Sequence, residues 1–145
     1  MLSNSSGIPM TASLLYRISS VILALFAVGH TIGFRQVDPR WGADTVVNGM
    51  RTVSFEVQAF NRTYWDFFTG FGIFVTVFLL FAAILAWRFG SMTPERLAAI
   101  PVERWSFAVC FVLIAALTWR YFFLAPGVLS TLAALGLVGA AWLGG

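Results

Sequence analysis

Four long apolar stretches constrain the fold of this chain more than any other feature of its sequence. They cover residues 14–34, 64–87, 105–124 and 128–143. Because an α-helix rises about 1.5 Å per residue, roughly 20 apolar residues suffice to cross the hydrocarbon core of a bilayer. The pattern predicts an all-α membrane protein, in which residues 1–145 form one domain built as a four-transmembrane-helix bundle.

The balance of apolar and charged residues argues against a soluble fold. Hydrophobic residues make up 59% of the chain and charged residues 10%, whereas about 25% of the residues of a typical soluble domain are charged. A soluble domain of this size would need a surface of charged and polar side chains, and this sequence has too few of them. Lipid, by contrast, solvates an apolar surface directly.

Most of the tryptophans stand at the ends of the apolar stretches. Five of the six do so, namely Trp65, Trp87, Trp105, Trp119 and Trp142. An indole prefers the headgroup region, where its ring lies among apolar groups while its N–H stays hydrated. The tryptophans therefore support the predicted boundaries of the spans.

The segments between the spans carry their own signals. Apolar residues recur at helical spacing from residue 45 to residue 60, at Val46, Met50, Val53, Val57 and Phe60. This spacing predicts an amphipathic helix over 45–60, between the first and second spans, that lies at the membrane interface or folds back over the bundle. Pro101 is expected to end a short helix in the second loop, and Pro126 to break the chain before the fourth span. Residues 1–10 are expected to form a flexible lead-in.

The charged and metal-ligating residues exclude several classes of function. The net charge is +3. The nine arginines of the chain are too scattered to make the clustered basic face that nucleic-acid binding needs. The chain has one cysteine and one histidine, which cannot form an intramolecular disulfide, a protein-only zinc site of the usual kinds or a bis-histidine haem site. We therefore predict no metal, no cofactor and no nucleic-acid partner.

Polar residues that are out of place in an apolar chain collect at one predicted membrane face. An ionisable group inside a span is costly, so an intramembrane histidine near carboxylates marks a candidate functional site. The proposed catalytic residues are His30, Glu56 and Asp66. The proposed ligand-binding residues are Arg35, Gln58, Asn61, Tyr64 and Trp65.

Small residues indicate how the first two spans meet at this face. They are Gly29, Gly33, Gly70 and Gly72. Glycines let two helix backbones approach closely in lipid. If the spans pack through these glycines, we expect His30 to reach Tyr64 or Asp66.

Each of the proposed catalytic residues also has a structural interpretation. His30 stands within about one turn of the helix end, where an imidazole costs little and can make a structural hydrogen bond. Arg62 and Asp66 are spaced i,i+4, which favours an ion pair at the start of the second span. Glu56 can pair with an arginine of the same loop. The two aromatic residues that begin the second span can be interface residues.

Residues 29–34 (GHTIGF) and 54–72 (SFEVQAFNRTYWDFFTGFG) together resemble a family of small bacterial four-helix membrane proteins. The resemblance is most specific over residues 14–87. It implies a multi-pass protein of the bacterial inner membrane, and it supplies no activity.

A looser likeness is to sterol-isomerase-type membrane bundles of the emopamil-binding class. Those proteins use histidine and acidic residues in a membrane cavity to shift a double bond through a carbocation. The likeness implies such parts for His30, Glu56 and Asp66, with Tyr64 and the tryptophans lining the cavity.

Two functions fit these observations. In the first, the protein binds or isomerises a lipophilic small molecule in a polar pocket at one membrane face, with His30 as acid or base. In the second, it is an accessory subunit that packs against a larger membrane complex, which suits the abundance of phenylalanine and small residues. Membrane lipids are expected partners in both cases.

Overall fold

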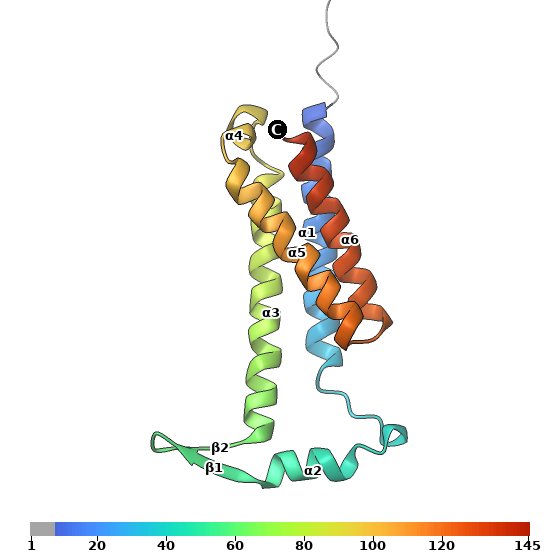
Figure 1. The fold of residues 1–145 in the computed structure, drawn as a ribbon, viewed down its shortest axis with the longest axis vertical. Coiled ribbons are helices and arrows are strands. Elements are labelled where there is room, and N and C mark those ends of the chain that lie inside the picture. Colours follow the sequence, from blue (N-terminus) through green and yellow to red (C-terminus); the bar gives the residue numbers. More distant parts are fainter. Residues whose placement is uncertain (1–7) are drawn as a thin grey trace, which may run out of the picture. The chain divides into compact units, whose positions relative to one another are not determined.

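The computed structural model describes residues 8–145, with side chains from Thr11 onward, and shows a mostly helical chain (Figure 1). The four long helices are α1 (Ile8–Gly33), α3 (Tyr64–Phe89), α5 (Pro101–Tyr121) and α6 (Leu124–Leu143). The shorter elements are the 3-10 helix η1 (Pro39–Trp41), α2 (Asp44–Thr52), the strands β1 (Ser54–Val57) and β2 (Phe60–Thr63), and α4 (Pro94–Ala98). All four long helices are long and apolar enough to cross a membrane, in agreement with the sequence.

The ends of the long helices differ from the predicted boundaries by a few residues. The helix α1 begins at Ile8, and residues 1–7 of the expected lead-in lie outside the described residues. Pro101 opens α5 instead of ending α4, and Pro126 lies in the first turn of α6, which begins at Leu124. Proline fits these places because the first N–H groups of a helix have no intrahelical acceptor.

The described chain forms two compact units. The first joins the residues up to Phe26 with Leu79–Gly145, and the second is Ala27–Phe78. The helices α1 and α3 each run from one unit into the other. All of α4, α5 and α6 belongs to the first unit, and α2 and both strands belong to the second.

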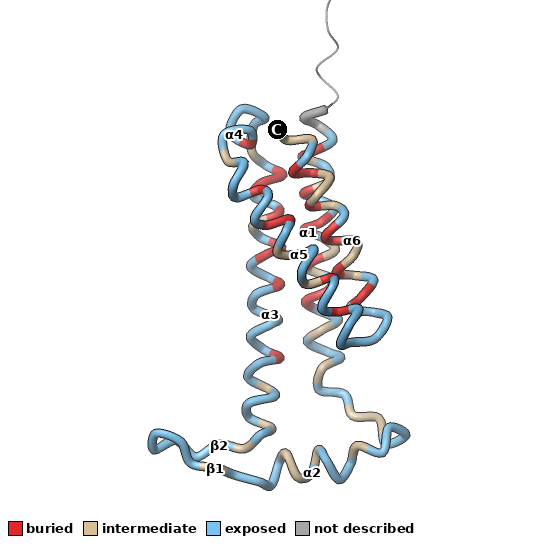
Figure 2. The backbone as a smooth tube through the Cα atoms, in the orientation of Figure 1, coloured by how far each residue is buried: buried red, intermediate tan, exposed pale blue. Residues whose placement is uncertain are grey.

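Each long helix of the first unit buries one face (Figure 2). Along α1 the buried positions follow one another at three- and four-residue steps: Ala12, Tyr16, Ser19, Leu23 and Phe26. The buried positions of α6 are mostly small: Gly127, Ser130, Ala133, Ala134, Leu137, Ala140 and Ala141. Small residues let the helices of this unit approach closely, and hydroxyl groups link them, as where Ser20 Oγ donates to the Ala83 carbonyl at 2.7 Å.

The second unit contains a feature that differs from the predicted helix over 45–60. The amphipathic helix is present as α2 but ends at Thr52, and β1 and β2 follow as an antiparallel hairpin. Val53 and Val57 fit the four-residue step of a helix, yet Phe55 and Val57 equally fit the two-residue step of a strand. Branched and aromatic side chains favour the strand. The helical spacing was therefore real over α2 and accidental beyond it.

Candidate functional site

All eight residues of the predicted site belong to the second unit, Ala27–Phe78. They come from three places along the chain. His30 and Arg35 lie at the end of α1 and just after it. Glu56, Gln58 and Asn61 lie in the hairpin, and Tyr64, Trp65 and Asp66 form the first turn of α3.

His30 binds a backbone group of the neighbouring helix. Its Nε2 atom lies 3.0 Å from the Gly72 carbonyl oxygen. Because a carbonyl oxygen can only accept, Nε2 must carry the proton in this hydrogen bond. The ring is half-buried and stacks on Phe34, with ring centroids 5.1 Å apart. His30 therefore links the end of α1 to α3, as its structural interpretation predicts.

The approach of these helices depends on one of the four glycines. A Cβ atom at Gly72 would overlap the Phe34 ring, whereas one at Gly29, Gly33 or Gly70 would meet nothing within 4 Å. The predicted packing through all four glycines is therefore wrong. The Phe34 ring fills the space above Gly72, and the other three glycines face outward.

Asp66 lies in the first turn of α3 and caps the start of this helix. Its Oδ2 atom accepts hydrogen bonds from the Thr63 backbone N–H at 2.8 Å and the Thr63 hydroxyl at 2.9 Å, and Thr63 Oγ1 accepts from the Asp66 N–H at 3.1 Å. This reciprocal pattern is a capping box, and it satisfies N–H groups that have no acceptor inside the helix. Arg62 instead donates to the Asn61 carbonyl and lies over the Phe60 ring. The predicted Arg62–Asp66 ion pair is replaced by this cap.

The hairpin residues are exposed. Glu56 and Asn61 are paired in the register of the two strands, so they share one face of the hairpin. Gln58 and Ala59 form the turn with positive φ angles of 53° and 65°. Glu56 thus lies on a solvated ribbon and not in an enclosed site.

The arginines near the predicted site lie over aromatic rings. Arg51 lies 4.5 Å from the centre of the Trp65 ring, and Arg35 lies 5.2 Å from the centre of the Phe34 ring. Tyr64 contacts Phe55 of β1, with ring centroids 5.1 Å apart. These cation–π and ring contacts tie the loop and hairpin to the ends of α1 and α3.

The turn after α1 is held by an ion pair. Asp38 accepts from the backbone and the guanidinium of Arg40, with Arg40 Nη2 at 2.6 Å from Asp38 Oδ2. The hydrogen bonds from the Arg40 side chain and backbone lower the pKa of the Asp38 carboxyl, so it stays charged at neutral pH. Gly42 closes the turn with a φ of 63°.

The structure does not bring the three proposed catalytic residues together. Within residues 8–145, the structure shows no hydrogen bond or ion pair between any two of His30, Glu56 and Asp66. His30 contacts α3 at Gly72. Gly72 lies six residues, or about 9 Å, along this helix from Asp66. The same described part of the chain holds no group of three His, Cys, Asp or Glu residues that could bind a metal ion.

Sequence reasoning missed a regular row of phenylalanines on α3. Phe67, Phe71 and Phe74 follow one another at steps of four and three residues, and they are 50%, 69% and 76% exposed. We call these three residues the phenylalanine row. The exposed aliphatic residues Ile73 and Leu80 lie about 100° or more around the helix from each phenylalanine of the row. Exposed Val75 and Val77 instead lie at the row's own four- and three-residue steps, from Phe71 and Phe74. The spacing of the phenylalanines in the sequence could have revealed the row.

Comparison of this chain with protein-family models, with curated proteins and with solved structures finds no match.

Proposed function

We propose that this chain is a multi-pass integral membrane protein that serves as an accessory subunit, packing against a helix of another membrane polypeptide through the phenylalanine row of α3. The observation that carries the proposal is the row of exposed phenylalanines along one side of this helix. The aliphatic residues Ile73 and Leu80 are exposed on another side.

Insertion in a membrane is supported by the surface of the four long helices. Their outward-facing residues are large and apolar along most of their lengths, which water would not tolerate in a folded monomer. We place the protein in the bacterial inner membrane, on the resemblance of residues 29–34 and 54–72 to small bacterial membrane proteins.

Contact with lipid alone does not account for the phenylalanine row. Lipid chains surround a helix uniformly, so they give no reason for three phenylalanines to repeat along one side of it. A partner helix does give such a reason, because it meets only positions that repeat at three- and four-residue steps. Phe67, Phe71 and Phe74 have this repeat.

The partner that fits this row is a helix with small residues and not a second copy of the same row. Close packing of helices in lipid relies on small residues on at least one side. If the row met its own copy, phenylalanine would face phenylalanine along the whole contact. A helix of another polypeptide with glycine, alanine or serine at the facing positions would accept the rings as knobs in holes.

The contacts of the polar residues suit a structural role. His30 joins two helices and Asp66 caps one of them, so both side chains hold the unit together. We propose that α2 lies at the membrane interface, because its apolar residues Val46 and Met50 share one face and its Arg51 lies over the Trp65 ring at the start of α3.

One observation favours binding of a lipophilic small molecule as a second function. With Nε2–H donated to Gly72, the Nδ1 atom of a neutral His30 ring carries a lone pair that can accept a proton. In this alternative, His30 would bind the ligand or move a proton on it during isomerisation. Glu56 and Asp66 would take no direct part, because Glu56 lies on the exposed hairpin and Asp66 caps α3.

Native mass spectrometry of the protein, extracted gently from its own membranes, separates the two functions. We expect a second polypeptide at fixed stoichiometry with the wild-type chain and with an Ile73→Ala/Leu80→Ala control. We expect its loss in a Phe71→Ala/Phe74→Ala variant. A partner-free particle that carries a small molecule, lost in His30→Ala, would replace the accessory function by the ligand-binding one.

A further inference from the structure

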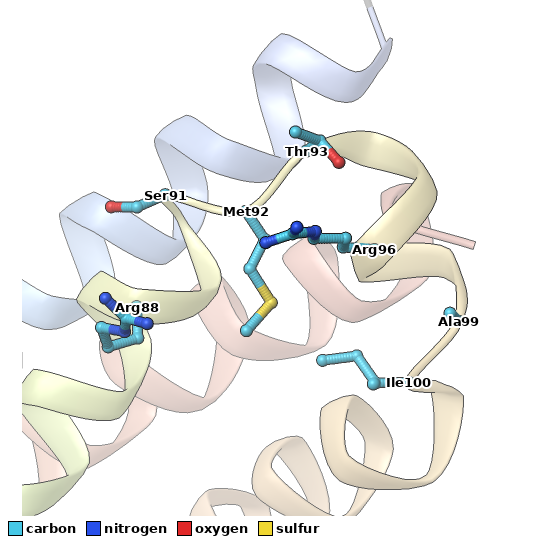
Figure 3. Close-up of a pocket in the computed structure, with 7 residues that line it drawn as sticks. All are labelled: Arg88, Ser91, Met92, Thr93, Arg96, Ala99 and Ile100. Carbon is cyan, nitrogen blue, oxygen red and sulfur yellow. The ribbon is translucent and has the colours of Figure 1, made fainter.

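The first unit contains a cavity at the connection between α3 and α4. Its volume is about 530 Å³, and it is wide open, since five of its seven lining residues are exposed. It is lined by Arg88, Ser91, Met92, Thr93, Arg96, Ala99 and Ile100. Figure 3 shows Arg88 on the last turn of α3 and Arg96 extending from α4 toward Met92.

The charge of this cavity is positive. Two arginines line it and no carboxylate does. In the described part of the chain, the structure shows neither Arg88 nor Arg96 bonded to an acid. Hydrogen bonds from its own backbone N–H and from the Thr93 side chain lower the pKa of the Glu95 carboxyl, so this acid, outside the lining, already has partners.

The rest of the lining divides into polar and apolar parts. The Ser91 hydroxyl donates to the Trp87 carbonyl at 2.8 Å, so the donors left for an anion are chiefly the two guanidinium groups. Met92, Ala99 and Ile100 supply an apolar wall. An occupant that matches both parts has a negative group joined to an apolar portion.

The position of the cavity along the helices is that of lipid headgroups. Arg88 directly follows Trp87 near the end of α3, and Trp105 lies in the second turn of α5. Both indoles are partly exposed. Tryptophans near the ends of membrane helices mark the headgroup region.

We infer that Arg88 and Arg96 bind the phosphate of an anionic phospholipid. The inference rests on the membrane insertion included in the proposed function, and not on the accessory partner. Guanidinium groups match phosphate oxygens with paired hydrogen bonds. The apolar wall formed by Met92, Ala99 and Ile100 would contact the glycerol and the first chain methylenes, which free phosphate lacks.

The test is a lipid titration of the delipidated full chain in a neutral detergent, followed by native mass spectrometry. The probes are phosphatidylglycerol, phosphatidylcholine with the same chains, and inorganic phosphate. We expect tighter binding of phosphatidylglycerol than of phosphatidylcholine. In Arg88→Gln/Arg96→Gln its affinity should fall about 30-fold, since each arginine near a membrane surface contributes roughly a factor of five.

The matched control is Arg120→Gln, which removes an exposed arginine at the other end of α5 and should leave the affinity unchanged. An equal loss in this control, or an unchanged affinity in the double variant, would overturn the inference. If inorganic phosphate displaced phosphatidylglycerol at a concentration similar to that of the lipid, the site would bind free phosphate and not specifically a phospholipid. Loss of the accessory partner would leave this titration unaffected, so the two proposals fail separately.

Discussion

Polar side chains in the long helices bind backbone carbonyls of other helices. Ser20 binds Ala83, His30 binds Gly72, and Arg104 Nη1 donates to the Ala141 carbonyl at 2.9 Å. In an apolar medium an unpaired polar group is costly, so such bonds orient one helix against another. At the scale of the residue, these links are the most informative feature of the chain.

Arg104 offers the clearest test of such a link. It is 3% exposed, and the Ala141 carbonyl that it binds lies in the last turn of α6, where carbonyl groups lack intrahelical donors. We expect Arg104→Met, which keeps most of the apolar stem, to lower the free energy of unfolding by about 2 kcal/mol. Denaturation in mixed micelles measures this change, with the exposed neighbour Glu103→Gln as control. A more stable Arg104→Met variant would show that the buried guanidinium destabilises the folded protein, because its Nε atom has no partner in the described structure.

The cap at the start of α3 gives a second test at this scale. Replacing Thr63 by Ala removes a hydroxyl that both donates to and accepts from Asp66, and should cost about 1 kcal/mol of stability. Asp66→Ala should destabilise in the same direction. Because the two side chains form one capping box, the double variant should lose less than the sum of the single changes. Additive losses in unfolding measurements would contradict the cap.

The candidate site could be predicted only in part, because single residues fit more than one spacing pattern. The sequence shows that Thr63 and Asp66 have capping-box spacing, but Arg62 and Asp66 have ion-pair spacing as well. Both patterns use the Asp66 carboxylate. Whether it caps the helix or pairs with Arg62 depends on where α3 begins, and helix ends are the least certain part of a sequence-based prediction.

At the scale of the element, Gly72 sets the contact between the end of α1 and α3. A side chain there would displace the Phe34 ring, which also stacks on His30. Gly70, two residues earlier on the same helix, faces open space. The two positions therefore form a matched pair in one helix.

We expect Gly70→Ala to stabilise the protein slightly, because alanine favours a helix over glycine by about 1 kcal/mol. Gly72→Ala should forfeit this gain through overpacking against Phe34, so that it is at least about 1 kcal/mol less stable than Gly70→Ala. Thermal unfolding of the two variants in the same detergent measures the difference. Equal stability would mean that Phe34 does not hold the helices at this point.

The hairpin shows where pattern reasoning reached its limit for an element. Its turn has Gln58 and Ala59 at positions where positive φ angles usually favour Asn and Gly. Without that turn signal, the apolar spacing of Val53, Val57 and Phe60 extended the predicted helix into both strands. The hairpin can form because β1 and β2 pair fully and Phe55 contacts Tyr64 and Phe67 of α3.

At the scale of the whole molecule, the number of long helices could be predicted because length and composition alone decide it. An apolar stretch of about 20 residues with few charges has few other stable states. The contacts of the candidate site could not be predicted in this way. They depend on which face each helix presents, as where Gly72 meets Phe34 while Gly29 and Gly33 face outward.

The central claim is that the phenylalanine row meets a helix of another polypeptide, and the most direct test is photo-crosslinking in native membranes. A photoreactive phenylalanine analogue is placed in turn at Phe71, Phe74, Ile73 and Leu80, which are all exposed positions of α3. We predict adducts with one foreign polypeptide from positions 71 and 74, and adducts with lipid from positions 73 and 80. Lipid adducts from all four positions would contradict the accessory function.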